Sequence, residues 1–166
     1  KILLDCGLFQ GINTSELNLN FDFDPKEIDV LLLSHAHIDH TGLVPRLVKK
    51  GFKGPIYCTA ATKALCKIML LDSARIQAFD LERINKRRVK RGEQTLEKLY
   101  DDEDVTQALA LFQEISLNEK LFLEENLTVE FFNAGHILGS TGILIDFGIK
   151  KVYFTGDIGR PNDKIL

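Results

Sequence analysis

The sequence predicts a mixed α/β fold in which strands and helices alternate first and a run of strands follows. Two patterns predict this order: apolar positions spaced as on a helix after Thr59, and short strand-like segments separated by turn residues after residue 120. The length of 166 residues is a third observation, because it suits one domain with a substantial core. We therefore expect residues 1–166 to form one layered α/β domain rather than a purely parallel βαβ series.

The chain is expected to begin with two strands and a short helix between them. Residues 1–6 are mostly apolar, which is typical of a strand, and the polar stretch over 9–20 predicts a loop. Asp24 before Pro25 predicts a helix start, because aspartate caps a helix N-terminus and proline fits its first turn. Residues 29–34 contain a continuous apolar run, which predicts a strand buried on both faces.

A helix, a strand and a long helix are expected next. Residues 42–50 predict a helix that stops at Gly51, and residues 54–57 predict another strand. Thr59 is a suitable N-cap for the long helix. The apolar residues expected on one face of that helix are Leu65, Ile68, Met69 and Ile76.

The character of the chain changes in its second half. Basic residues occupy six of the eleven positions from 81 to 91, and acidic residues return at 101–104. The acidic residues favour a helix start, and this helix is expected to end near Phe112. Strands joined by turns are then expected over residues 120–123, 127–132, 141–147 and 151–155.

Composition excludes several classes of protein. Hydrophobic residues make up 45% and charged residues 27%, which is usual for a globular chain and not for a disordered or fibrous one. No apolar run approaches the roughly 18–20 residues of a membrane span, so we expect no membrane association. A formal net charge of −3 does not by itself indicate nucleic-acid binding. The three cysteines (Cys6, Cys58 and Cys66) cannot all pair and lack close metal spacing, which favours a reducing compartment, the cytoplasm.

Three of the four histidines of the protein fall within six residues, in the segment Ser34-His35-Ala36-His37-Ile38-Asp39-His40. His35 and His37 are two residues apart, so in an extended segment they point the same way. Asp39 and His40 follow where the chain turns toward a helix, and they can face a neighbouring point. One segment therefore offers two ligand pairs, suited to two adjacent metal ions. Imidazole and carboxylate are the ligands of open, catalytic zinc sites.

Three polar positions at predicted strand ends extend this pattern. His136 would add a third nitrogen for the first metal ion, and Asp157 could bridge both ions. All four histidines then belong to one site. Asp5, at the end of the first predicted strand, has two interpretations: a turn residue that ends the strand, or an acceptor that orients the histidines.

At these motifs the sequence resembles the metallo-β-lactamase superfamily, whose hallmark is His-x-His-x-Asp-His. Leu3-Leu4-Asp5-Cys6-Gly7, the segment from His35 to His40, Gly135-His136 and Gly156-Asp157 resemble its four successive motifs. Within the superfamily, three strings are most similar to the β-CASP branch of RNA-processing nucleases. They are Asp5-Cys6-Gly7-Leu8-Phe9-Gln10-Gly11, Gly135-His136-Ile137-Leu138-Gly139-Ser140 and Phe154-Thr155-Gly156-Asp157-Ile158-Gly159-Arg160.

The resemblance implies a fold and a ligand set. The fold would be the αβ/βα sandwich of the superfamily. The first zinc ion would be held by His35, His37 and His136, and the second by Asp39 and His40. Asp157 would bridge the two ions, and Asp5 would support the site. Nucleases of this branch carry a β-CASP insertion, a last zinc ligand and a general-acid histidine further along. We therefore expect a partial domain that lacks the β-CASP domain and the C-terminal portion, and an incomplete catalyst.

The function expected from these features is zinc-dependent hydrolysis of RNA phosphodiester bonds through a water activated by two metal ions. Asp39 is the expected catalytic residue, because it would also orient that water. The alternatives are another hydrolase on the same fold, acting on thioesters or lactones, and a non-catalytic RNA-processing scaffold. The basic run near residue 86 either attracts a polyanionic substrate or is a solvated surface. Exposed sheet edges favour self-association into a homo-oligomer.

Overall fold

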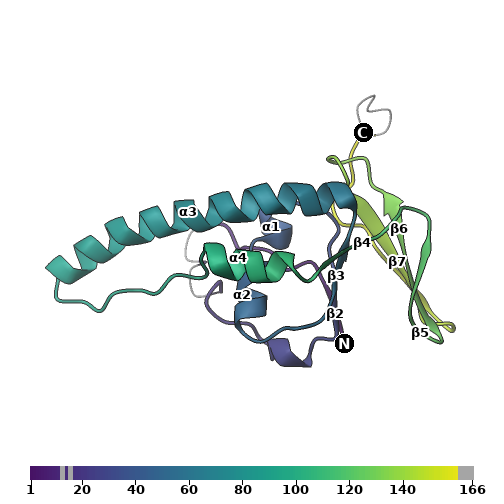
Figure 1. The fold of residues 1–166 in the computed structure, drawn as a ribbon, viewed down its shortest axis with the longest axis horizontal. Coiled ribbons are helices and arrows are strands. Elements are labelled where there is room, and N and C mark those ends of the chain that lie inside the picture. The colour runs from purple at the N-terminus through teal and green to yellow at the C-terminus, as the bar shows by residue number, and fades with distance from the viewer. Residues whose placement is uncertain (12–13, 15–16, 161–166) are drawn as a thin grey trace.

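The computed structural model describes residues 1–11, 14 and 17–160, and it places a layer of helices, a first sheet and a second sheet side by side (Figure 1). The first sheet is parallel, with the strands β1 (Ile2–Leu4), β2 (Val30–Leu32), β3 (Ile56–Cys58) and β4 (Phe112–Glu114) in that order. The second is antiparallel, in the order β5 (Lys120–Glu124), β6 (Leu127–Asn133), β7 (Thr141–Asp146) and β8 (Lys151–Phe154). The mixed α/β architecture is therefore confirmed, with a parallel and an antiparallel part.

The helices pack on one face of the parallel sheet and share a core with it. They are a 3-10 turn (Pro25–Glu27) and the α-helices α1 (Ile38–Thr41), α2 (Val44–Lys49), α3 (Ala60–Lys90) and α4 (Asp102–Leu109). This core contains Leu31 from the sheet, Leu47 from α2, Leu70 from α3 and Val105 from α4, all with no exposed surface. The caps follow the sequence: Asp24, Thr59 and Asp101 each accept a backbone N–H of the helix that they start.

The two sheets pack face to face through a second core. Val30 and Leu32 of β2 contact the side of the antiparallel sheet that carries Phe131 and Ile143. Burial of both faces of β2 explains its continuous apolar sequence. In the described part of the chain, the outer face of the second sheet carries no helix, so the structure contains three of the four layers of the expected αβ/βα sandwich.

Two sequence expectations about the helical part are correct only in part. Residues at the end of the predicted helix near Phe112 form β4, an edge strand that pairs with β3. In α3, Leu65 and Met69 pack against the core as expected. Ile68 and Ile76 are exposed, and the most buried positions are Thr62, Cys66, Leu70 and Ala74. Spacing alone therefore identified only part of the side that packs.

The remaining elements lie close to their expected positions. The predicted loop over 9–20 has no helix or strand among its described residues, and residues 12–13 and 15–16 fall outside the described part. All four strands expected after residue 120 are present. Among the described residues, no helix combines the length and the apolar character needed to cross a membrane.

Candidate metal centre

The site forms where one end of the first sheet meets one end of the second, at the C-terminal ends of β1, β2, β6 and β8. Because β1 and β2 are parallel, Asp5 after β1 lies beside the segment that follows β2. In the second sheet β6 and β8 both run antiparallel to β7, so the chain leaves both strands at one end, toward His136 and Asp157. Thr141 joins the sheets there: its N–H and its hydroxyl donate to the Ser34 carbonyl at 2.8 and 2.9 Å.

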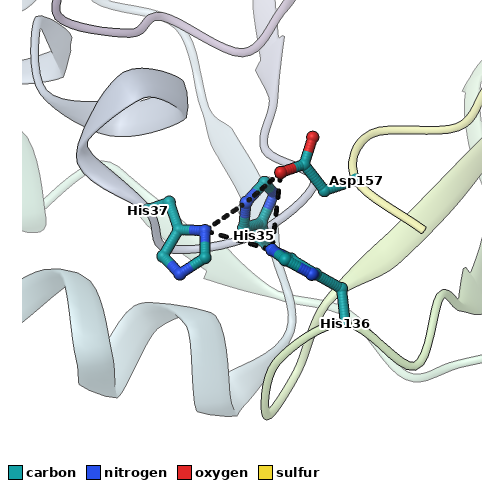
Figure 2. Close-up of side chains that lie close together, drawn as sticks. All are labelled: His35, His37, His136 and Asp157. Carbon is teal, nitrogen blue, oxygen red and sulfur yellow. Dashed lines mark hydrogen bonds and ion pairs between the residues drawn. The ribbon is translucent and has the colours of Figure 1, made fainter. Parts of the chain in front are cut away.

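Four side chains converge on one point (Figure 2). His35 Nε2 lies 3.0 Å from His37 Nδ1, which lies 3.2 Å from His136 Nε2. Asp157 Oδ2 lies 3.8 Å from His35 Nε2 and 3.4 Å from His136 Nε2. The four ligand atoms all lie within 4.8 Å of one another, although they come from three separate segments of the chain.

This geometry fits a zinc ion. A tetrahedral zinc with ligands at about 2.0–2.1 Å holds neighbouring ligand atoms about 3.3 Å apart. Four of the six pairs of ligand atoms are 3.0, 3.2, 3.4 and 3.8 Å apart, close to that value, and all pairs lie within 4.8 Å. Three imidazoles and one carboxylate are also a donor set that zinc accepts. The cluster is therefore able to hold a metal ion.

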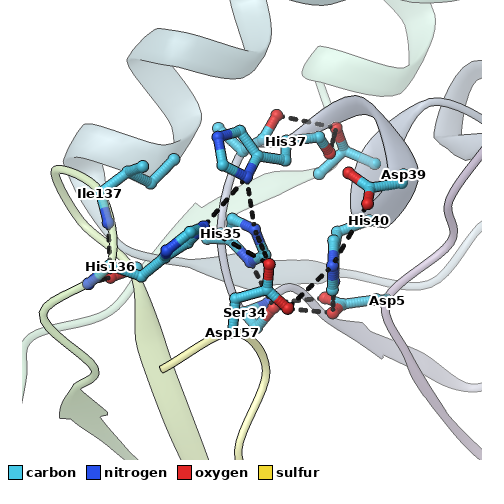
Figure 3. Close-up of polar contacts among 12 residues, drawn as sticks. Asp5, Ser34, His35, His37, Asp39, His40, His136, Ile137 and Asp157 are labelled. Atoms are coloured by element: carbon cyan, nitrogen blue, oxygen red, sulfur yellow. Dashed lines mark hydrogen bonds and ion pairs between the residues drawn. The ribbon is translucent and has the colours of Figure 1, made fainter. Parts of the chain in front are cut away.

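A second group of donors lies next to the first (Figure 3). His40 Nε2 lies 3.4 Å from Asp157 Oδ1 and 4.0 Å from Asp39 Oδ2. The two carboxylate oxygens of Asp157 thus face different partners, Oδ2 toward the first cluster and Oδ1 toward His40. The Asp39 side chain is 57% exposed, so this group opens toward solvent.

Asp5 orients two of the histidines through hydrogen bonds. It accepts bonds of 2.7 Å from the Ser34 N–H, the Ser34 hydroxyl and His40 Nδ1. Because the Ser34 hydroxyl gives its only proton to Asp5, the 2.9 Å contact with His35 requires that Nδ1 of His35 donates. A neutral His35 ring then presents an unprotonated Nε2 to the site, and the bond to Asp5 holds the His40 ring with Nε2 toward Asp157. Asp5 occupies this place with φ 55°, a conformation that aspartate tolerates better than most residues.

The electrostatic environment acts differently on these two histidines. Burial, helped by His40 and His37, lowers the pKa of His35 to about 4. The hydrogen bond to Asp5 raises the pKa of His40, and the charges of Asp5, Asp157 and Asp39 add to this effect. At neutral pH His35 therefore carries no proton on the nitrogen that faces His37 and Asp157.

The loop that carries His136 is held from two sides. Inside the loop, the Ser140 hydroxyl accepts the N–H groups of His136 at 2.9 Å and Ile137 at 3.2 Å. Outside it, the Gly139 carbonyl accepts the hydroxyls of Thr59 at 2.9 Å and Thr62 at 3.0 Å, both from the start of α3. The first turn of α3 therefore fixes the position of the loop.

Close backbone contacts complete the site. A Cβ atom on Gly7 would lie 1.6 Å from the Asp39 carbonyl, and one on Gly159 would lie 1.5 Å from the Gly135 carbonyl. Only glycine allows these approaches, which bring the Asp5 strand end against α1 and the Asp157 segment against the His136 loop.

The structure brings together all seven residues predicted for the site: Asp5, His35, His37, Asp39, His40, His136 and Asp157. Sequence reasoning missed the residues that hold them, which are Ser34, Ser140, Thr141 and Thr62, and it assigned Thr59 only as a helix cap. Ser34 directly precedes His35, and that position was the only signal for it. The contacts of Thr59 and Thr62 with Gly139 span about 80 residues, so no local pattern indicates them.

The model of the metallo-beta-lactamase superfamily matches residues 1–166. The chain belongs to this superfamily. The metallo-beta-lactamase fold protein YhfI from Bacillus subtilis superposes with a TM-score of 0.54 over 97% of this chain and 52% of its own, at 16% sequence identity. That superposition supports the fold alone.

Curated relatives are similar over all or nearly all of the chain. Ribonuclease TTHA0252 of Thermus thermophilus is 34% identical over all of this chain and 34% of its own length. Cleavage and polyadenylation specificity factor subunit 3-I of Arabidopsis thaliana is 29% identical over all of this chain and 22% of its own. Transcription termination factor FttA of Methanosarcina mazei is 33% identical over 95% of this chain and 23% of its own. The predicted resemblance to the RNA-processing β-CASP branch is confirmed, and the chain spans about a third or less of these relatives.

Proposed function

We propose that the protein containing this chain is a zinc-dependent ribonuclease that hydrolyses RNA phosphodiester bonds at a centre of two metal ions. The division of the Asp157 carboxylate between two neighbouring donor groups carries this proposal. A carboxylate that offers one oxygen to each group is suited to bridge two ions, and paired ions suit phosphodiester hydrolysis. The similarity to a ribonuclease and to a cleavage factor supports RNA as the substrate.

Each residue of the site has a role in this proposal. The first ion would be held by His35, His37 and His136, the second by Asp39 and His40, with Asp157 between them. When bound, two zinc ions would activate a shared water and neutralise charge on the attacked phosphate. Asp39 is exposed enough to accept a hydrogen bond from that water and orient it. Asp5 acts as a positioning residue, since it fixes the ring orientation of His35 and His40.

The location and assembly state are part of the same proposal. Cys6, Cys58 and Cys66 are buried free thiols, which supports a reducing compartment, and we place the protein in the cytoplasm. We further propose that residues 1–166 form one partial domain of the protein, and that the protein self-associates as a homo-oligomer.

The test combines metal analysis with a substrate panel. Full-length protein purified without chelators should contain zinc and should cleave single-stranded RNA faster than DNA, a thioester, a lactone or a β-lactam. Asp157→Asn should abolish most of the RNA cleavage, because the amide cannot bridge two cations. Asp102→Asn, which changes an exposed carboxylate on α4, is the matched control and should retain activity. Protein that cannot be loaded with zinc, or that turns over the thioester or lactone faster than RNA, would refute the proposal.

A further inference from the structure

The last third of α3 projects beyond the other helices (Figure 1). This part of the helix carries Arg83, Lys86, Arg87 and Lys90, and all four are exposed. Their spacing of i, i+3, i+4 and i+7 places them in one row on one side of the helix, which we name the basic ridge. Between residues 79 and 91 there are six basic residues against two acidic ones, in a chain whose formal net charge is −3.

The opposite side of this projecting helix is occupied by the chain that follows it. The Asn85 amide donates to the Leu96 carbonyl at 2.9 Å and accepts the Leu96 N–H at 2.8 Å. Arg88 donates to the Gln94 carbonyl at 2.6 Å and pairs with Glu93 at 3.0 Å. The returning segment therefore supports the helix from one side, and the basic ridge faces away from it.

The charges of the ridge are largely uncompensated. Lys86 pairs with Glu82 at 2.6 Å. Among the described residues, no acidic side chain forms an ion pair with Arg83, Arg87 or Lys90. Asp80 lines a shallow cavity with Arg83 and Arg87, and it is the other acidic residue of this stretch. Arg83, Arg87 and Lys90 are therefore available to form ion pairs with a binding partner.

The same side of α3 continues toward the metal centre. Phe79 and then Ile76 lie on this side of α3, between the ridge and the start of the helix. Phe79 is 64% exposed, and the centre of its ring lies 6.0 Å from the guanidinium carbon of Arg83. Ile76 lines a cavity of about 310 Å³ with Ile38, the residue that follows His37. At about 1.5 Å per residue, the helix separates Thr62 from Lys90 by about 42 Å. A strand stacked at about 3.4 Å per nucleotide covers that distance with about 12 nucleotides.

We propose that the basic ridge binds the sugar-phosphate backbone of single-stranded RNA whose continuation reaches the metal centre. This inference rests on the proposed ribonuclease function and adds a second contact region for its substrate. Arginine and lysine pair with phosphates, and an exposed aromatic ring such as Phe79 offers a surface on which a base stacks. An acidic protein is the alternative partner, and the test below distinguishes it from RNA.

The test measures RNA affinity of the full-length protein at several salt concentrations. The probe is a fluorescein-labelled oligouridylate of about 20 nucleotides, longer than the about 12 that the helix requires. The variant Arg83→Ala/Arg87→Ala/Lys90→Ala removes three cations that hold no ion pair, so the fold should persist. The slope of log K against log salt should fall by about 2, since each phosphate contact of a single strand contributes about 0.7.

The matched control removes three exposed lysines elsewhere, as Lys50→Ala/Lys53→Ala/Lys150→Ala, with the same change in net charge. The control should keep the wild-type slope. An unchanged slope in the ridge variant, or an equal loss in the control, would overturn the inference and leave an acidic protein as the candidate partner. The measurement is repeated on metal-depleted protein, where binding occurs without cleavage. A protein that shows the ridge effect but cleaves no RNA after zinc loading supports the ridge and refutes only the proposed function.

Discussion

Asp5 shows how one carboxylate prepares several metal-binding atoms. It accepts hydrogen bonds from the Ser34 hydroxyl and from His40. Through Ser34 it also fixes the tautomer of His35. A ring whose Nδ1 donates in this way keeps Nε2 free to bind a metal ion. A change at Asp5 would therefore affect two of the predicted metal ligands at once.

The first prediction concerns Asp5→Asn. Asparagine keeps the size of the side chain and tolerates the positive φ, but one of its two ends is a donor and cannot accept the bonds that Asp5 accepts. Zinc affinity should fall about 10–100-fold, as is usual when a partner of a ligand is changed. Competition with a chromophoric chelator measures the affinity, and circular dichroism checks the fold. Asp22→Asn, on an exposed side chain, is the control, and equal affinities in both variants would contradict this role.

At this scale the histidines could be predicted from the sequence, because three lie within six residues and their spacing has a geometric meaning. The supporting serines could not. Ser140 acts on His136 through a turn whose shape depends on Gly139 and on contacts with α3, and serine in a loop is common without such a role.

Among the elements, α3 links the helical layer to the metal centre. Its first turn donates to the Gly139 carbonyl, its first half packs on the core through Cys66 and Leu70, and its last third carries the basic ridge. The helix is 31 residues long, so a contact at its start and a surface at its end serve different parts of the molecule.

The second prediction is for Thr62→Val, which removes the hydroxyl and keeps the shape of the side chain. The half-buried Gly139 carbonyl keeps Thr59 as a donor but loses Thr62, which should cost about 0.5–1.5 kcal/mol of the free energy of unfolding. The His136 loop should become looser, so zinc affinity should fall as well. Urea denaturation and zinc titration measure the two effects.

The matched control is Thr106→Val in α4, whose hydroxyl donates to the Asp102 carbonyl on the surface. It should change both quantities little. A Thr62→Val protein that loses stability but binds zinc as tightly as the wild type would show that the contact is structural only.

The elements themselves were predictable to different degrees. Burial alternates along β5 and the middle of β6, and turn residues separate all four antiparallel strands, so these strands could be identified from the sequence. The short β4 continues from α4 without a polar break, and its pairing with β3 is a contact between distant segments. Local sequence carries no sign of such a pairing.

In the whole molecule, the second sheet exposes apolar side chains on its outer face. Phe122 on β5 is 67% exposed, and Tyr153 on β8 is 52% exposed. β5 and β8 are also the edges of this sheet in the described structure. Exposed apolar surface next to free strand edges favours association with another chain.

The third prediction is that residues 1–166 produced alone self-associate as concentration rises. Phe122→Lys/Tyr153→Lys should shift the protein toward the monomer, because charges on the sheet face oppose contact between copies. Ile68→Lys, at an exposed apolar position on α3, should not. Sedimentation velocity at several concentrations distinguishes these results, and a monomer at every concentration would be contrary to the prediction.

The predicted metal ligands follow strands of both sheets, so the complete donor set forms only when both sheets have folded. His37 and His136 are separated by 99 positions, and each follows a different sheet. During synthesis the segment with three histidines emerges long before His136 and Asp157, so an early chain has only part of the donor set. Tight binding of a metal ion would therefore have to wait until the two sheets have docked. An ion held by the complete set would link the two sheets, and its binding would indicate that they have docked.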